Sequence, residues 1–296
     1  MDGRHKCRVH HNTSGLMRRL RLQMMAGGNL LLLDLYPNAA AAYSLRKLRN
    51  AYSGSAIRVR RSNDNTEQDI GFDANGNLDT AALTSFCTGT NGFITTWYDQ
   101  STIGRNATQT TAIRQPQIVS SGNITTDGGK PALTFNGNYY LEIVNRPLTA
   151  ATQYAFFDVA NAQTVNSNEL LFNQSNNGGN SSCFEIRRNS GNNNLLVIWG
   201  GSSSFTSVGS INQRLLYSIM RDSTTTKLYF NGNLDSQITQ AISAIGNFPC
   251  YIGAGPAYIP SLLWNGLQQE IIVYANDQTT NQPNIDSNIK TYYGIP

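Results

Sequence analysis

From Phe93 to Tyr274 the sequence repeats one pattern, in which a short strand-like run is followed by a loop rich in Asn, Gly and Ser. Such runs include FITTWY, PALTFNG, QYAFFDVA, CFEIRR and GLQQEIIVYA. Alternation of apolar and polar residues places one set of side chains on each face of a strand. Many short strands with regular turn signals and few helices predict an all-β protein, either an antiparallel β-sandwich or a jelly roll.

A few short helices and one clear hairpin are expected within this pattern. A helix is predicted over residues 38–52, because Asn38 is a good N-cap and NAAAAYSLRKLRNAY has apolar residues on one face. Asp79 predicts the cap of a second short helix, and Pro283 suits the first position of a third. The Asn-Gly pair in TTTKLYFNGNLDS predicts a hairpin turn.

Charge is distributed unevenly along the chain. Residues 1–61 carry twelve Lys/Arg and two Asp, a net +10, whereas residues 62–296 carry ten basic and sixteen acidic side chains, a net −6. We therefore expect a basic N-terminal arm over residues 1–36 and a body over residues 37–296. Such an arm docks on nucleic acid, a membrane surface or an acidic protein, unless it is a solvated tail. The candidate anchoring residues are Arg4, Lys6, Arg8, Arg18, Arg19, Arg21, Arg46, Lys47 and Arg49.

Several classes of chemistry are disfavoured by what the sequence contains. His5, His10 and His11 are the three histidines, so the body has none for Ser-His or Cys-His catalysis. HKCRVHH could chelate a metal, but no closed tetrahedral site is evident, and we expect neither metal nor cofactor. The longest apolar run, NLLLLDLY, is far shorter than the about 20 residues of a membrane span.

The stretch from Tyr43 to Gln109 resembles the catalytic domain of fungal α-L-arabinofuranosidase B. It contains AYSLRKLRNAYSGSAIRVRRSNDNTEQDIGF, then SFC, then ITTWYDQSTIGRNATQ. The resemblance implies a concanavalin A-like jelly-roll β-sandwich. The segments LLLDLYPNAAAAYSLRKLR and NIKTYYGIP also look like parts of virion proteins of tailed bacteriophages.

The family that the chain resembles hydrolyses its glycoside with retention, which needs two carboxylates about 5 Å apart. By this resemblance the nucleophilic Glu falls on Gly200 or Gly201, and the acidic Asp falls on Gly255. Glycine can neither attack nor donate a proton, so we expect no catalytic residue. The alternative is an unrecognised pair of catalytic carboxylates. Two candidates are disfavoured, because arginines flank Glu185, which argues against a proton-donating role, and alternation predicts that Glu270 faces solvent.

Cysteine usage also departs from the family. The resemblance implies a disulfide between Cys87 and position 92, which is Gly92 here, and an adjacent Cys-Cys pair where this chain has Leu170 and Leu171. This departure favours stabilisation by packing or assembly over extracellular disulfides.

Two further groups of side chains call for a choice between structural and binding roles. Asp99 and Gln100 follow an apolar strand, and we expect them to bond the backbone of the next turn rather than a substrate. Trp199, Tyr258 and Trp264 lie in or beside loops that match the family's cleft, and are candidates for carbohydrate binding. The alternative for each aromatic residue is packing in the core or rim.

These observations lead to one functional expectation and two alternatives. We expect a non-enzymatic structural or surface protein of a bacteriophage virion, serving as capsid decoration, fibre or receptor-binding module. Its arm would dock on other virion proteins of the capsid or tail, and the body, as a homo-oligomer on the extracellular virion surface, would bind host-surface glycans. The alternatives are a glycoside hydrolase acting on arabinose-containing polysaccharide and a free carbohydrate-binding module.

Overall fold

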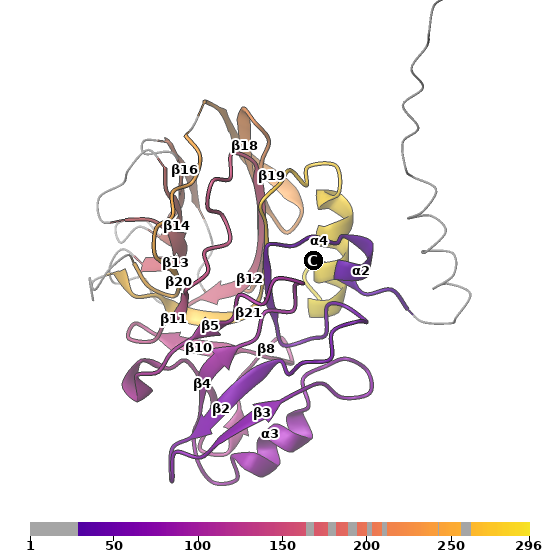
Figure 1. Ribbon diagram of the computed structural model, residues 1–296, viewed down its shortest axis with the longest axis vertical. Coiled ribbons are helices and arrows are strands. Elements are labelled where there is room, and N and C mark those ends of the chain that lie inside the picture. Colours follow the sequence, from indigo (N-terminus) through magenta and orange to yellow (C-terminus); the bar gives the residue numbers. More distant parts are fainter. Residues whose placement is uncertain are drawn as a thin grey trace, which may run out of the picture.

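The strands form a sandwich of two sheets, with further strands and a short helix below it (Figure 1). The computed structural model of the chain describes residues 29–163, 169–176, 182–188, 194–199, 203–208, 212–241, 243–255 and 262–296. Within 194–199 and 203–208 it describes the backbone, and among the side chains of these two ranges it describes that of Val197.

The back sheet has β21 at its centre. On one side β21 pairs with β12, which leads to β17, β18 and β19, and on the other side it pairs with β1 and β10, all antiparallel. The strands are β1 (Ala41–Ser44), β10 (Leu133–Asn136), β12 (Tyr154–Ala162), β17 (Leu215–Arg221), β18 (Thr225–Phe230), β19 (Asn233–Thr239) and β21 (Asn265–Tyr274).

The front sheet is also antiparallel and runs in the order β5, β11, β20, β13, β14, β15, β16. Its strands are β5 (Ala107–Thr108), β11 (Leu141–Ile143), β13 (Glu169–Gln174), β14 (Phe184–Arg188), β15 (Asn194–Trp199), β16 (Ser203–Val208) and β20 (Cys250–Ile252).

A lower group of elements joins the two sheets. β4 pairs with β5 of the front sheet and with β6, which in turn pairs with β10 of the back sheet. The elements are β2 (Ile57–Arg61), β3 (Glu67–Ile70), α3 (Thr80–Phe86), β4 (Gly92–Trp97), η1 (Ala112–Arg114), β6 (Gln117–Ser120), β7 (Asn123–Ile124), and the ribbon of β8 (Thr126–Asp127) and β9 (Lys130–Pro131).

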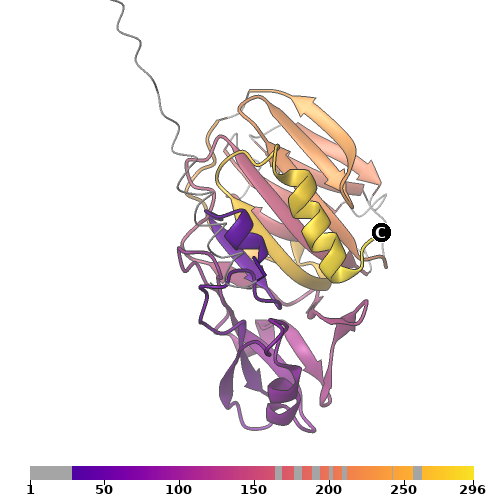
Figure 2. The ribbon, with the colours of Figure 1, turned by 90° about the vertical axis from the view of Figure 1, so that its right-hand side faces the viewer.

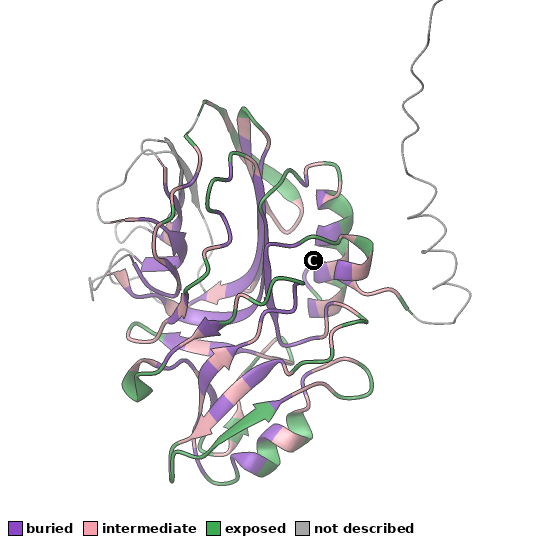
Figure 3. Ribbon diagram, viewed as in Figure 1, coloured by how far each residue is buried: buried purple, intermediate pink, exposed green. Residues whose placement is uncertain are grey.

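The main core lies between the two sheets. Phe156 of the back sheet meets Phe172 and Phe184 of the front sheet, with ring centroids 4.9 and 5.6 Å apart. A second core covers the other face of the back sheet, where α4 (Gln282–Tyr293) and α2 (Leu32–Leu35) pack against it (Figure 2). The centre of the back sheet is therefore covered on both faces, and its strands β12, β17 and β21 are almost continuously buried (Figure 3).

The predicted all-β sandwich is confirmed, but the helix predicted over residues 38–52 is wrong. Ala41–Ser44 form β1, which pairs with Val273–Glu270 of β21 and is buried along its whole length. Tertiary pairing with a strand more than 200 residues away overrides the local preference of alanine and leucine for a helix. Residues 32–35, assigned to the arm, fold as α2, and Leu32 and Leu33 pack in the second core.

The other local predictions are confirmed. Asp79 caps α3 by accepting a hydrogen bond from the Ala82 amide, and α4 has its proline in the first turn. Asn231 and Gly232 form the turn between β18 and β19, both with positive φ, as this turn type requires. No helix among the described residues is long and apolar enough to cross a membrane.

Candidate active site

A row of side chains crosses the outer face of the front sheet. The register aligns Thr108, Glu142, Tyr251, Asn173 and Glu185 on successive strands β5, β11, β20, β13 and β14. Neighbours of these residues along the strands lie in the main core, so alternation points the row away from the core. We call this row and its surroundings the front face. It brings two carboxylates, an amide and a phenol to one surface.

Glu185 and Asn173 form the buried part of the front face. They lie directly opposite each other, which places their Cβ atoms about 5 Å apart, and they expose 5% and 0% of their surface. The Asn173 amide donates to the Ala254 carbonyl, while its buried Oδ1 has no partner among the described residues. No described residue forms an ion pair with Glu185. A buried carboxylate that no described residue neutralises, beside an acceptor that no described residue uses, is typical of a functional site rather than a structural one.

Glu142 is the other carboxylate of the row. It is three strand spacings from Glu185, which corresponds to about 14 Å between the two backbones. That separation exceeds the about 5 Å between the carboxyl groups of a retaining pair and the about 6.5–9.5 Å of an inverting pair. Glu142 and Glu185 therefore do not form a ready catalytic pair.

The register also places the strands that lie near the two positions matched to the family's carboxylates. The site of a Cβ on Gly255 is 3.1 Å from Leu170, which aligns with Leu196 two strands away. Leu196 precedes Trp199 by three residues, so Leu170 and Trp199 are about 14 Å apart. The register thus places the end of β15 about 14 Å from Leu170, the neighbour of Gly255, but it does not place residues 200 and 201. The two matches therefore stay expectations, and the pair of glycines does not establish that catalysis is lost.

Gly255 itself cannot be replaced by a larger residue without movement. An added Cβ would lie 2.8 Å from Leu262 Cβ, well inside van der Waals contact. Gly200 and Gly201 lie outside the described residues. No Asp or Glu occurs in residues 189–221 or 236–269, so a small shift of the match does not supply a carboxylate at either place.

Other acidic residues belong to the interior. The prediction that Glu270 faces solvent is wrong: it is 1% exposed and forms an ion pair of 2.7 Å with Arg46. Asp158 lies between the two sheets, where both carboxylate oxygens accept hydrogen bonds of 3.1 Å from Gln268. Burial raises the pKa of Asp158 to about 7. Neither group reaches the front face.

The predicted structural role of Asp99 and Gln100 is confirmed. Asp99 accepts hydrogen bonds from the backbone amides of Ala42, Ser101 and Arg105 at 2.7–2.9 Å. Gln100 accepts from the Leu48 amide and donates to two carbonyls of the same segment. Through these hydrogen bonds both side chains connect the segment that follows β4 to β1 and the residues after it, and neither is free to bind a substrate.

The aromatic candidates for carbohydrate binding have different positions. Trp264 is 0% exposed and packs on Phe135, with ring centroids 5.2 Å apart, so its face is not available to a sugar. The backbone of Trp199 ends β15 opposite Phe184, and its side chain is outside the described part. Tyr258 also lies outside the described residues. Tyr251 was missed, although its alternation in CYIGAG could have indicated it.

One of the basic anchoring candidates has an internal role. Arg46 is 8% exposed, pairs with Glu270, and lies over the Tyr292 ring at 4.6 Å, so the prediction that it anchors the arm is wrong. Lys47 and Arg49 are partly exposed and stay candidates. The six arm residues lie outside the described part of the chain: Arg4, Lys6, Arg8, Arg18, Arg19 and Arg21.

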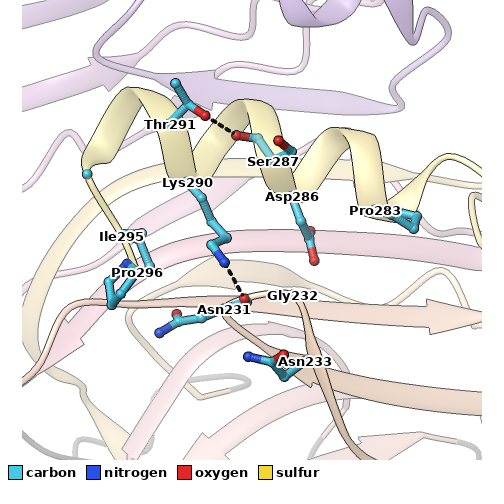
Figure 4. Close-up of a pocket in the computed structure, with 11 residues that line it drawn as sticks. Asn231, Gly232, Asn233, Pro283, Asp286, Ser287, Lys290, Thr291, Ile295 and Pro296 are labelled. Atoms are coloured by element: carbon cyan, nitrogen blue, oxygen red, sulfur yellow. Dashed lines mark hydrogen bonds between the residues drawn. The ribbon is translucent and has the colours of Figure 1, made fainter.

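A pocket of about 540 Å³ lies between α4 and the β18–β19 turn (Figure 4). Lys290 Nζ donates to the Asn231 carbonyl at 2.8 Å, and Asp286 accepts from Ser218 Oγ at 2.7 Å. Burial raises the pKa of Asp286 to about 6. Both charged side chains therefore have partners that hold α4 to the back sheet. This pocket is on the side of the molecule away from the front face.

Comparison with known proteins identifies the family. The sequence profile described as "Alpha-L-arabinofuranosidase B, catalytic" matches residues 34–206, more than half of the chain. This chain belongs to the arabinofuranosidase B catalytic family. The probable α-L-arabinofuranosidase B of Aspergillus fumigatus is 35% identical over 127 residues, which are 39% of this chain and 25% of that protein. The enzyme of Aspergillus oryzae is 36% identical over 104 residues, which are 34% and 20% of the two chains.

Solved arabinofuranosidases share the fold. An arabinofuranosidase in complex with arabinofuranosyl-α-1,2-xylobiose superposes with a TM-score of 0.62 at 15% identity, covering 85% of this chain and 62% of the other. An α-L-arabinofuranosidase soaked with a cyclic sulfate inhibitor gives 0.59 over the same shares. The chain spans a quarter or less of the curated relatives and under two thirds of these structures.

These matches overturn the expected bacteriophage role. The profile, the relatives and the superposed structures are all arabinofuranosidases, and none of them is a virion protein. The expected partners among capsid or tail proteins are therefore also wrong, and nothing in these matches supports a virion surface as the location. The arabinofuranosidase match agrees with one local detail: a Cβ on Gly92 would lie 2.8 Å from Cys87 Sγ, so position 92 suits a disulfide partner of Cys87.

Proposed function

We propose that this chain acts as a glycoside hydrolase on arabinose-containing polysaccharide. Its membership of the arabinofuranosidase B catalytic family, through a match over residues 34–206, carries the proposal. The substrate class follows from the names of the relatives, which are α-L-arabinofuranosidases. Because polysaccharides are too large to pass through a cell membrane, we also propose that the chain acts outside the cell.

The front face is the proposed substrate surface, and Glu185 is the proposed acid-base carboxylate. Glu185 is buried, lacks an ion-pair partner among the described residues, and lies opposite the unused acceptor of Asn173. Tyr251 and Glu142 extend the same row toward solvent with groups that bind sugar hydroxyls. Positioned carboxylates of this kind transfer protons to and from reacting oxygens.

A second candidate function is binding of the same polysaccharide without cleavage. It is favoured by one observation: residues 189–221 and 236–269, which contain both positions matched to the family's carboxylates, have no Asp or Glu. In this case the front face would hold arabinose side chains through Asn173, Tyr251 and the two glutamates.

A chromogenic arabinofuranoside and an insoluble arabinoxylan distinguish the two functions. Hydrolysis predicts turnover by the purified chain that falls about 10²- to 10⁴-fold in Glu185→Gln. Glu67→Gln, which changes an exposed glutamate of β3 outside the front face, is the matched control and should retain the activity. Turnover that is unchanged in Glu185→Gln would refute the role of Glu185. Arabinoxylan retention without any turnover would establish the second candidate instead.

A further inference from the structure

A second polar pocket lies at the edge of the front face. It has a volume of about 360 Å³ and is lined by Ile103, Arg105, Val144, Asn145, Arg146, Thr149 and Asn247. The pocket begins where β11 ends: Val144 follows Ile143, which pairs with Ala107, two residues after Arg105. Figure 1 shows β5, β11 and β20 together in this region. The pocket thus adjoins the end of the row that holds Glu142 and Tyr251.

The charge of this pocket is carried by two arginines, and none of the described residues that line it is acidic. Arg146 has no hydrogen bond or ion pair to any described residue, and its Nε is buried without a partner. Arg105 donates through Nη1 to the Ala40 carbonyl at 2.6 Å, while its Nε is also buried and unpartnered. Nearby Asp99 is occupied by backbone amides, including that of Arg105. Two guanidinium groups thus share a hollow in which no described residue supplies a counter-charge.

Arginine without a partner in a partly buried hollow is suited to a carboxylate, which it binds through two parallel hydrogen bonds. The rest of the lining matches a sugar ring. Ile103 and Val144, which are 55% and 59% exposed, offer apolar contacts, and Asn145, Thr149 and Asn247 offer groups for hydroxyls. The volume lies within the range of small-molecule sites.

We propose that this pocket binds the carboxylate of a uronic acid on the polysaccharide whose arabinose groups occupy the front face. The inference rests on the proposed function and narrows its substrate class to acidic, uronate-bearing arabinose polysaccharide. Arg146 is the principal ligand of the carboxylate, and Arg105 assists it. Neutral arabinose polysaccharide binds through the front face alone and therefore binds more weakly.

The test compares the binding of two soluble probes by calorimetry. One is an arabinosylated xylo-oligosaccharide with a glucuronic acid branch, and the other is the same oligosaccharide without the acid. The wild-type chain should bind the acidic probe at least tenfold more tightly, with the difference reduced at 0.5 M salt. Arg146→Gln should remove the difference and leave binding of the neutral probe unchanged, because this side chain has no described partner in the fold.

Lys227→Gln is the control for net charge, because Lys227 lies on β18 of the back sheet. It should retain the preference for the acidic probe. An equal affinity of the wild type for both probes, or a preference that survives Arg146→Gln, would overturn the proposal. Inorganic sulfate that competes as strongly as the acidic probe would overturn the sugar assignment.

Failure of the proposed function would look different from failure of this pocket. If the neutral oligosaccharide does not bind and no turnover occurs, glucuronic acid alone still tests the pocket. Its binding should be measurable in the wild type and lost in Arg146→Gln. Loss of the neutral probe with retention of glucuronic acid would refute the front face as substrate surface and uphold the pocket.

Discussion

Asp158 gives the sharpest physical prediction, because its carboxyl group is enclosed between the two sheets. Burial raises its pKa from 3.8 to about 7, against the opposing effect of the hydrogen bonds from Gln268. A shift of about 3 pKa units corresponds to about 4 kcal/mol of differential stability. The folded chain holds this proton more tightly than the unfolded chain. The stability is therefore fully present below about pH 4 and is lost as the pH rises to about 7.

Asp158→Asn removes this titration while keeping the shape of the side chain. The new amide oxygen can still accept from Gln268, and the NH₂ group adds a donor beside the Gln268 amide, whose Oε1 lacks a described partner. We expect variant and wild type to differ little near pH 4. At pH 8 the variant should be the more stable, by up to about 4 kcal/mol, since relaxation around the ionised group lowers the full value.

Urea unfolding followed by tryptophan fluorescence at several pH values between 4 and 8 measures this difference. Subtracting the free energies of unfolding of variant and wild type removes the other titrating groups. Asp286→Asn is the companion variant: burial raises the pKa of Asp286 to about 6, so its difference from the wild type should grow between about pH 4 and 6 and stay constant above that. A difference for Asp158→Asn that stays constant across the range would show that Asp158 is ionised in the fold, and would refute the reasoning.

Three further changes should affect stability in defined directions. Arg46→Met leaves the Glu270 carboxylate buried without its ion pair and should cost about 3–5 kcal/mol by urea unfolding, while Glu270→Gln with Arg46→Met should recover part of it. Gly232→Ala places a side chain at φ 82° and should cost about 1–2 kcal/mol in the same assay, and a neutral result would refute that strain. Gly92→Cys should form a disulfide with Cys87 on oxidation, which thiol titration detects. The oxidised variant should be more stable than its reduced form by about 2 kcal/mol, and Cys87 and the new cysteine both remaining free thiols after oxidation would contradict this.

Much of the fold was predictable because strand alternation, helix caps and turns each depend on a short stretch of sequence. β2, α3, the β18–β19 hairpin and α4 follow their local signals. β1 does not, because AAYS has no strand signal of its own and becomes a strand only through its pairing with β21. Distant pairing of this kind leaves no trace in a local window.

Glu270 shows a second limit of alternation. β21 is buried along nine of its ten residues, since the front sheet covers one face and α4 and α2 the other. In a strand covered on both faces, polar residues at alternate positions do not mark a solvent-facing side. The Arg46–Glu270 pair joins β21 to the segment after β1, and neither residue indicates the other in the sequence.

The site depends on which residues lie beside one another across strands, and a match along the chain does not contain that information. Gly255 and the residues after Trp199 each look equivalent to a catalytic position when compared one stretch at a time, but only cross-strand register says which residues lie side by side. The same register brings Glu185 opposite Asn173, two residues that are unremarkable in sequence. If Glu185→Gln abolishes turnover, acid-base function in this chain has moved along the front face to a neighbouring strand. If arabinoxylan binds without turnover, the face has kept its contacts with sugar and lost its proton donor.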